Sequence, residues 1–321
     1  MSSDFNYILS LLQIQRNLYR FGGPILIAVG TVSCILSLIV FMKKNLRKNP
    51  CSIYLVAFNI SNFLLIYTSI VFSTLSTGYN IDPSLQDRGF CRFRFYAMLL
   101  FNILSPSYLI LASIDRVLIT SPNARTRQRS TPRLAYIGII SITVFWLLAH
   151  IHALILTDLL QVGPGFFICY YRPGTHIVLV SYYSLIIRGI LVPLLMVILG
   201  LWAIKNVRRV NRGTPASAVP ASGAAIVAGV RTTHSKDRQL LKILLVDIIV
   251  YIVFHLMISV ILLDQQFIQK QSGTVIQASL QLVLANIGVF STFIPFCVAC
   301  YTNLLVSKAF RCEVRNVLTC K

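Results

Sequence analysis

Two oppositely charged residues stand side by side at the end of a long apolar stretch. Asp115 and Arg116, followed by Val117, come after a run of uncharged residues that covers 95–114. A carboxylate and a guanidinium next to lipid are costly unless they pair with each other or reach water. An Arg side chain is always charged and presents a planar fork of donors, so it can pair with the neighbouring carboxylate. The alternative is that Arg116 only extends toward the lipid headgroups.

Three further ionisable residues lie inside apolar runs, namely Arg188, Asp247 and His255. Such residues are rare in membrane helices and usually face a cavity, a partner or the bundle interior. We expect Arg188 either to contact an acidic ligand group or to extend outward. Asp247 is expected to be hydrogen-bonded inside the bundle, in a polar network with Asn62 or in structural packing. His255 is either a ligand contact or a core histidine with satisfied hydrogen bonds.

Seven apolar stretches are long enough to carry these residues across a bilayer, since about 20 apolar residues span its hydrocarbon core. Backbone groups in lipid must bond within their own segment, so each stretch is predicted to be a helix. The composition agrees, with 56% hydrophobic residues, 12% charged residues and a mean hydropathy of +0.75. The fold class is therefore an all-α membrane protein with a seven-transmembrane helix bundle. The predicted helices are Gly23–Met42, Cys51–Leu75, Arg94–Ile119, Leu134–Thr157, Val178–Ile204, Leu240–Leu263 and Val275–Leu305.

A shorter segment, Ser307–Leu318, follows the last span. Phe310 and Val314 stand one helical turn apart in it, which predicts an amphipathic helix lying on the membrane surface. Cys312 lies in this segment and Cys320 follows it, and both are expected on the cytoplasmic side. They are either palmitoylated, as juxtamembrane cysteines can be, or unmodified thiols.

Basic residues gather on one side of the predicted bundle. The first, third and fifth links and the tail hold 20 of the 29 Lys and Arg residues, against 7 on the other side. This bias predicts that the N-terminus lies outside and the tail in the cytoplasm, and it assigns the net charge of +20 to membrane lipids rather than nucleic acid. The membrane is expected to be the plasma membrane. The expected organisation is an extracellular N-terminus (1–22), the bundle (23–305) with a flexible cytoplasmic loop at about 206–238, and a cytoplasmic surface helix and tail (306–321).

Two cysteines fall on the predicted outer side. Cys91 lies just outside the third predicted helix, and Cys169 lies in the link between the fourth and the fifth. The separation between Cys91 and Arg116 corresponds to roughly 37 Å of helix, which is one membrane crossing with its interfaces. Because both thiols face the oxidising side, we expect a disulfide, with two free thiols as the alternative.

With these features the chain resembles the rhodopsin-like G protein-coupled receptors. That family joins a Cys at the top of helix three to one in the second outer loop, and it has an Asp-Arg-Tyr tripeptide at the bottom of helix three. It also has a Trp in helix four, a Pro in helix five and a Phe-Arg pair in its surface helix. The matching residues here are Cys91, Cys169, Asp115-Arg116-Val117, Trp146, Pro193 and Phe310-Arg311.

The resemblance implies a receptor that passes an outer ligand signal to a heterotrimeric G protein. It implies that Arg116 controls the state of the bundle, paired in the closed state with Asp115. By the family's spacing Asp237 is a second partner of Arg116, the alternative being one charge in a mixed surface run. Side chains at heights where this family binds ligands, together with two of the ionisable residues above, form the expected pocket: Phe95, Met98, Asn102, Tyr182, Arg188 and His255.

Departures from the family pattern mark the chain as a divergent receptor of the peptide-receptor type. Asn62 stands where the family has Asp, although Ser105 keeps its family partner position, and these two with Asp247 form the expected polar core. By our alignment helix six has His255 and Met257 in place of the family's Trp and Pro. The rigid frame is thus kept while the activation switch is altered.

A signalling receptor with a small peptide ligand is the leading functional hypothesis. The outer stretches are too short for a large ectodomain, and the outer half of helix three lacks the acid that an amine ligand would need. The alternative is a small-solute transporter or channel, which calls for several ionisable residues along one path and for broken helices. The sequence has no metal cluster, nucleophile motif or phosphate loop, so no enzyme, metal or cofactor is expected.

Overall fold

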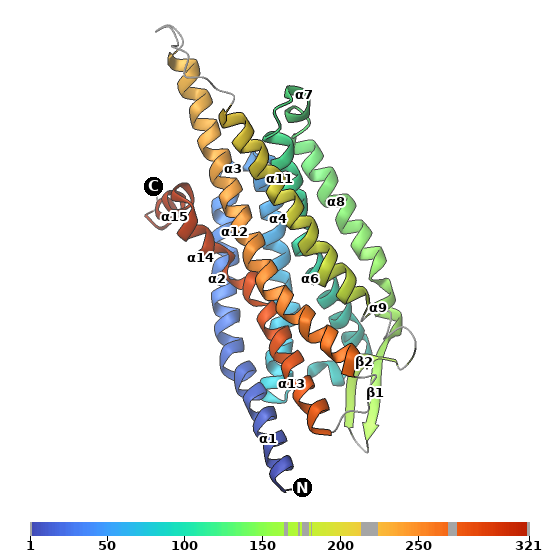
Figure 1. Ribbon diagram of the computed structural model, residues 1–321. Helices are drawn as coiled ribbons and strands as arrows, with labels where there is room; N and C mark the ends of the chain where they lie inside the picture. The colour runs from blue at the N-terminus through green and yellow to red at the C-terminus, as the bar shows by residue number, and fades with distance from the viewer. Residues whose placement is uncertain are drawn as a thin grey trace.

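The computed structural model describes residues 2–163, 166–172, 174, 180, 182–212, 224–268 and 275–319. Within these residues, seven helical segments are long and apolar enough to cross a membrane, and they pack as an elongated bundle (Figure 1). The predicted seven-transmembrane architecture is therefore confirmed. We call the end of the bundle that carries the two strands the hairpin end, and the opposite end, near the C-terminal helix, the α15 end.

The first span begins earlier than predicted. It consists of α1 (Ser2–Asn17), the π-helical η1 (Leu18–Gly22) and α2 (Gly23–Phe41). The predicted start at Gly23 is the start of α2, but helical turns precede it, and hydropathy did not mark them because α1 contains many polar residues. The added turns pack against the seventh span, where Tyr19 donates from its hydroxyl to the carbonyl of Asn286 at 3.0 Å. Figure 1 places the N-terminus at the hairpin end.

The second span starts at a capped proline. After the short α3 (Lys44–Arg47), the Asn49 side chain accepts a hydrogen bond from the backbone N–H of Cys51 at 3.0 Å. A side-chain oxygen at this position satisfies a helix N–H that has no intrahelical partner, and a proline at the first position needs none. The span runs through α4 (Pro50–Leu65), η2 (Ile66–Ile70), α5 (Val71–Ser73) and η3 (Thr74–Gly78).

The third span is the central helix of the bundle. A 3-10 turn, η4 (Pro83–Leu85), precedes α6 (Arg88–Ile119), which packs against the second, fourth and fifth spans. Asp87 caps α6 by accepting from the backbone N–H groups of Gly89 and Phe90. The helix therefore starts before the predicted Arg94 and places Cys91 in its first turn.

The fourth span leads into a hairpin that the sequence did not predict. After the short α7 (Ala124–Arg127) in the preceding link, the span comprises α8 (Pro132–Ala149) and α9 (Ile151–Leu156), and the strands β1 (Thr157–Gly163) and β2 (Phe166–Tyr171) follow. The strands are antiparallel, with Leu159 opposite Cys169. The helix ends at Leu156 instead of the predicted Thr157, and the chain then turns back across the end of the bundle (Figure 1).

The fifth and sixth spans continue beyond the lipid-length segments that hydropathy marked. The fifth has the π-helical η5 (Ser184–Leu191) and α11 (Val192–Arg212), and the sixth is the single long helix α12 (Ala224–Ile268). The predicted flexible loop at about 206–238 was thus too long at both sides, because residues 206–212 and 224–238 are helical. The predicted start at Val178 lies outside the described residues.

The seventh span bends in its middle. Helices α13 (Val275–Thr292) and α14 (Ile294–Val306) meet at Phe293, just before Pro295, which lacks the N–H that would continue the helix. Helix α15 (Lys308–Leu318) then turns away from α14 (Figure 1). Its buried Phe310 packs on Phe41 of α2, with ring centroids 5.6 Å apart.

Candidate functional site

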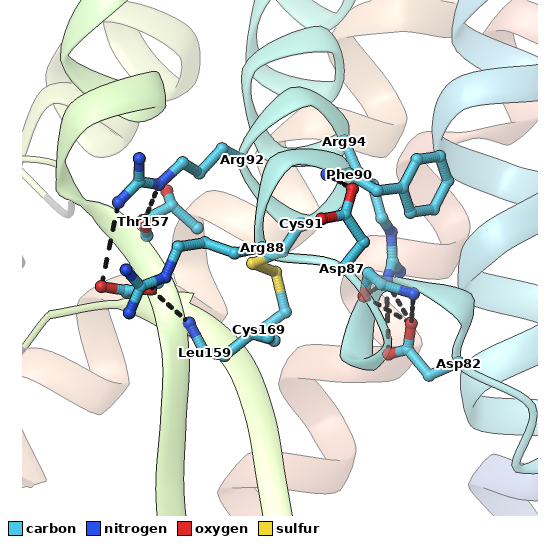
Figure 2. The surroundings of a disulfide bond; sticks show 12 residues. Asp82, Asp87, Arg88, Phe90, Cys91, Arg92, Arg94, Thr157, Leu159 and Cys169 are labelled. Carbon is cyan, nitrogen blue, oxygen red and sulfur yellow. Dashed lines mark hydrogen bonds and ion pairs between the residues drawn. A yellow bond between two sulfur atoms is a disulfide. The ribbon is translucent and has the colours of Figure 1, made fainter.

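The predicted disulfide ties the hairpin to the central helix. Cys91 in α6 and Cys169 in β2 are bonded, with their Cα atoms 5.8 Å apart (Figure 2). Arg92, one residue further along α6, donates from Nε to the carbonyl of Thr157 at 3.1 Å and so holds the start of β1 as well. The hairpin is therefore attached to α6 through both of its strands.

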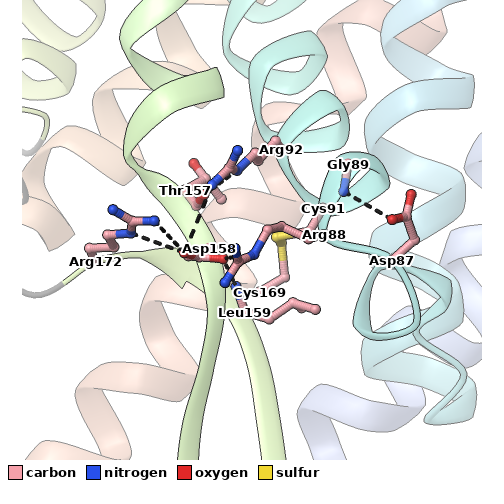
Figure 3. A network of polar contacts seen from close by, with 10 residues as sticks. All are labelled: Asp87, Arg88, Gly89, Cys91, Arg92, Thr157, Asp158, Leu159, Cys169 and Arg172. Carbon is pink, nitrogen blue, oxygen red and sulfur yellow. Dashed lines mark hydrogen bonds and ion pairs between the residues drawn. A yellow bond between two sulfur atoms is a disulfide. The ribbon is translucent and has the colours of Figure 1, made fainter.

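A single carboxylate next to this disulfide gathers three arginines, a feature that sequence reasoning missed. Asp158 lies 2.6 Å from Arg172 Nη2, 2.6 Å from Arg88 Nε and 3.9 Å from Arg92 Nη2 (Figure 3). Hydrogen bonds from Arg172, together with the backbone N–H of Leu159 and the charge of Arg88, hold the pKa of the Asp158 carboxyl below its ordinary value. The group is only 5% exposed, yet Arg88 and Arg172 keep 60% and 50% of their side chains exposed. The hairpin end thus presents an excess of positive charge.

Two of the predicted pocket residues meet inside the bundle. Arg188 of η5 donates from Nη2 to Oδ1 of Asn102 in α6 at 2.6 Å. The neighbouring Gly189 lets η5 approach α12 closely, since a Cβ atom there would lie 2.5 Å from Oγ of Ser259. Three spans therefore converge around the Arg188 guanidinium.

Two aromatic rings of α12 are stacked in the interior of the bundle. The rings of Tyr251 and His255 have centroids 3.7 Å apart and planes 19° apart, and Phe296 of α14 meets both edge-on. His255 Nδ1 lies 3.1 Å from the carbonyl of Tyr251, so the hydrogen is assigned to Nδ1 because a carbonyl only accepts. In the part of the chain that the structure describes, Tyr251 Oη and His255 Nε2 are buried without a hydrogen-bond partner.

The remaining expected pocket residues lie closer to the hairpin. Phe95 meets Tyr170 and Tyr171 of β2 edge-on, with centroids 6.0 Å and 5.7 Å away, and Met98 packs in the same apolar cluster. Tyr182 is 45% exposed. Its neighbour Tyr183, which sequence reasoning did not single out, is the tyrosine that turns inward.

Tyr183 joins the fifth span to the fourth through a histidine. Its hydroxyl lies 3.1 Å from His150 Nε2, while His150 Nδ1 lies 2.9 Å from the carbonyl of Trp146. Because that carbonyl accepts, the hydroxyl of Tyr183 donates to Nε2. The sequence signal was available, since His150 is an ionisable residue at the end of an apolar run.

The expected polar core is divided between two places. Ser105 donates from its hydroxyl to Oδ1 of Asn62, which joins α6 to α4. Asp247 accepts instead from the Thr302 hydroxyl of α14 at 3.3 Å. The carboxylate of α12 is therefore linked to the seventh span, and Asn62 to the third.

The other charged pair lies at the α15 end. Arg116 is fully buried and donates from Nη2 to Asp115 Oδ2 at 2.7 Å and to Asn49 Oδ1 at 3.0 Å. Ser130, in the link after α7, donates to Asp115 Oδ1 at 2.5 Å. Val117 packs in a cluster between α6, α11 and α12.

Two further predicted residues, Asp237 and Cys320, are described only in part or not at all. Asp237 lies in α12, but its side chain is outside the described residues, as is all of Cys320. Cys312 is an exposed free thiol on α15. In the described part of the chain, no group of three or more His, Cys, Asp or Glu residues could hold a metal ion.

Comparison with known families agrees with the seven helical spans in the described residues. The model of the "7 transmembrane receptor (rhodopsin family)" matches residues 33–292. The chain belongs to this family. The match extends from the middle of α2 to the end of α13, and it favours the receptor over the transporter or channel and over an enzyme. No curated protein matches this receptor.

Proposed function

We propose that this receptor lies in the plasma membrane with its hairpin end and N-terminus outside. A disulfide forms and persists in an oxidising compartment, which suits the end that holds Cys91 and Cys169. The α15 end carries the basic links, which suits the cytoplasmic side. A tag before Ser2 should bind antibody on intact cells, and a tag after Lys321 only after permeabilisation. The reverse labelling would contradict this orientation.

The ligand that we propose is a small peptide. A two-stranded sheet leaves the outer edge of each strand without a strand partner, and such an edge can pair with an extended peptide backbone. The hairpin is held over the end of α6 by its disulfide, so a peptide on its edge would lie above Phe95. From there the ligand would reach Asn102, Arg188 and His255 between the third, fifth and sixth spans.

The intracellular partner that we propose is a heterotrimeric G protein, which would bind at the α15 end. The observation that carries this proposal is the enclosure of Arg116 by Asp115 and Asn49, which marks a closed state. Opening would release the guanidinium toward the partner. The ligand would drive opening only as far as its affinity differs between the two states.

The link between ligand and partner would run through α11. Asn206 is buried near its end and donates from Nδ2 to the carbonyl of Val117 at 3.3 Å. A movement of η5 around Arg188 would therefore be transmitted along one helix to the residue after Arg116. Membrane lipids would contact α15. The exposed thiol of Cys312 would carry an acyl chain that inserts among these lipids.

Nucleotide exchange on purified G proteins tests the coupling. Wild-type receptor in nanodiscs should accelerate exchange on at least one G protein class, and Arg116→Ala should lower the rate at equal amounts of folded receptor. Because removing one member of a buried ion pair can unfold a protein, Arg116→Lys serves as a second variant that keeps the charge but not the planar fork. Arg20→Ala, an exposed charge in η1 toward the hairpin end and away from the proposed partner face, is the matched control and should leave the rate nearly unchanged.

A substitution of Asp237 tests the coupling independently in the same exchange assay. If the side chain of Asp237 holds Arg116 in the closed state, Asp237→Ala should raise basal exchange modestly. An absence of exchange with wild type on every G protein class, or equal rates for wild type and both Arg116 variants, would contradict the proposed coupling.

A further inference from the structure

We propose that the ligand carries a carboxylate and that this group binds the guanidinium of Arg188 inside the bundle. The proposal rests on the receptor function proposed above and adds the chemical class of the ligand. Arg188 belongs to a π-helical segment, a form that often occurs at functional sites. Its head points toward α6, where it meets Asn102.

The charge of Arg188 has no acidic partner among the described side chains. Each carboxylate whose side chain the structure describes is engaged elsewhere. Asp82 pairs with Arg94, Asp87 caps α6, Asp115 pairs with Arg116, Asp158 meets three arginines, Asp247 bonds to Thr302, and Glu313 pairs with Lys43. A guanidinium remains charged even in an apolar interior, and such a charge is costly without a counter-ion.

The hydrogen bonds of Arg188 are equally incomplete. The side chain has five N–H donors, and the structure pairs Nη2 with the neutral amide of Asn102. Its Nε is buried without a partner. A carboxylate accepts two parallel N–H bonds from a guanidinium, so a ligand carboxylate would supply both the missing charge and the missing acceptors.

The neighbouring side chains extend the match to a peptide end. Tyr251 interacts electrostatically with Arg188, and its buried hydroxyl is a donor without a partner. His255 Nε2 is a buried acceptor without a partner, because the hydrogen lies on Nδ1. The last residue of a peptide presents a carboxylate next to an amide N–H. The carboxylate would accept from Arg188 and Tyr251, and the N–H would donate to Nε2 of His255. A small organic acid presents only the carboxylate.

The charge at the hairpin end is favourable for binding the same ligand. Arg88 and Arg172 are exposed at the hairpin end, and one carboxylate faces three arginines there. A surface with excess positive charge raises the local concentration of anions and speeds their association. Anions would thus be concentrated at the hairpin end of the bundle.

The first test needs no ligand. The thermal midpoint of purified full-length receptor is measured for wild type, Arg188→Gln and Arg94→Gln, the last being a control arginine that has its carboxylate, Asp82, at 3.0 Å. We expect Arg94→Gln to lower the midpoint by about 2 °C or more. Arg188→Gln should leave the midpoint equal or raise it, because it removes an unpaired charge. A lower midpoint for Arg188→Gln would mean that the charge is already satisfied in the receptor, which would overturn the proposal.

The second test supplies the carboxylate. Three probes are added to the same receptor at equal ionic strength: a pool of N-acetylated tripeptides with free C-termini, the same pool as C-terminal amides, and glutarate. The acid pool should raise the wild-type midpoint, while the amide pool should not, and Arg188→Gln should need at least about tenfold more acid for the same shift. A shift with glutarate alone would assign the site to small organic acids. Equal shifts with acids and amides, equal shifts in wild type and Arg188→Gln, or no shift with any probe would overturn the proposal.

The nucleotide-exchange assay separates this proposal from the receptor function on which it rests. Basal exchange that depends on Arg116 would persist if the ligand class were wrong. Acid binding that depends on Arg188, without exchange on any G protein, would contradict the coupling and leave the ligand class standing.

Discussion

Oδ1 of Asn49 lies 3.0 Å from Nη2 of Arg116 and 3.0 Å from the backbone N of Cys51. One oxygen therefore caps α4 and holds the arginine at the end of α6. Release of Arg116 would leave the cap in place, so the two spans can separate without unwinding α4.

Replacing the amide of Asn49 should shift the resting state. Asn49→Ala removes a hydrogen bond to a charged group, worth about 1.5 kcal/mol or more, and should raise basal nucleotide exchange about tenfold. Asn49→Asp keeps the helix cap and adds a charge opposite Arg116, so it should lower basal exchange. Loss of the α4 cap in Asn49→Ala would destabilise the closed and the open state alike. The thermal midpoints of both variants measure this loss, so that the exchange rates can be compared at equal amounts of folded receptor. Basal rates that do not change in opposite directions would argue against Asn49 as part of the closed state.

Removing the disulfide should loosen the hairpin. The bond joins residues 78 positions apart, and in the chain-entropy model closing a loop of that length contributes about 4 kcal/mol. Cys91→Ala should therefore lower both the thermal midpoint and surface expression. Peptide mapping without reducing agent should show the linked pair in wild type. Two freely alkylated thiols would contradict the bond.

The Asp158 cluster predicts how the hairpin end responds to acid. Its carboxyl pKa is lower in the folded state than in the unfolded chain, so its stabilising effect is present above the unfolded pKa, near pH 4, and is lost as pH falls through the folded value. Hydrogen exchange of the β1 and β2 amides should thus be slow at pH 7 and accelerate only in strong acid. Asp158→Asn should give fast exchange already at pH 7, because three arginines lose their shared partner. Similar protection in Asp158→Asn and wild type would show that the disulfide alone holds the strands.

The contact at Gly189 predicts a pair of compensating substitutions. A Cβ atom there would meet Ser259 Oγ at 2.5 Å, so Gly189→Ala should destabilise the receptor by about 1–3 kcal/mol despite the better helix propensity of Ala. Adding Ser259→Ala should recover much of this loss, and a double-mutant cycle measures the recovery. Gly200→Ala is the control, since its nearest neighbour is the end of the Leu245 side chain at 3.2 Å. A cycle with no coupling between positions 189 and 259 would mean that η5 and α12 adjust independently.

The sequence alone determined the features that depend on local composition. Lipid-length apolar runs predicted all seven spans, because a hydrocarbon layer imposes the same length and the same internal hydrogen bonding on any helix. The adjacency of Asp115 and Arg116 made their ion pair readable without a fold. Hydropathy could not find α1 or the full length of α12, because those turns contain too many polar residues to form an apolar run.

Only the tertiary structure decided which polar side chains meet across spans. Arg188 and Asn102 are 86 positions apart, and Arg116 and Asn49 are 67 apart. Whether such residues touch depends on how each helix is rotated about its axis, and that rotation is set by packing against every neighbouring helix. For the same reason the sequence could not predict that Tyr183, and not Tyr182, points into the bundle. A difference of one position rotates a side chain by about 100° around the helix, and only the packed bundle selects which of the two faces the interior.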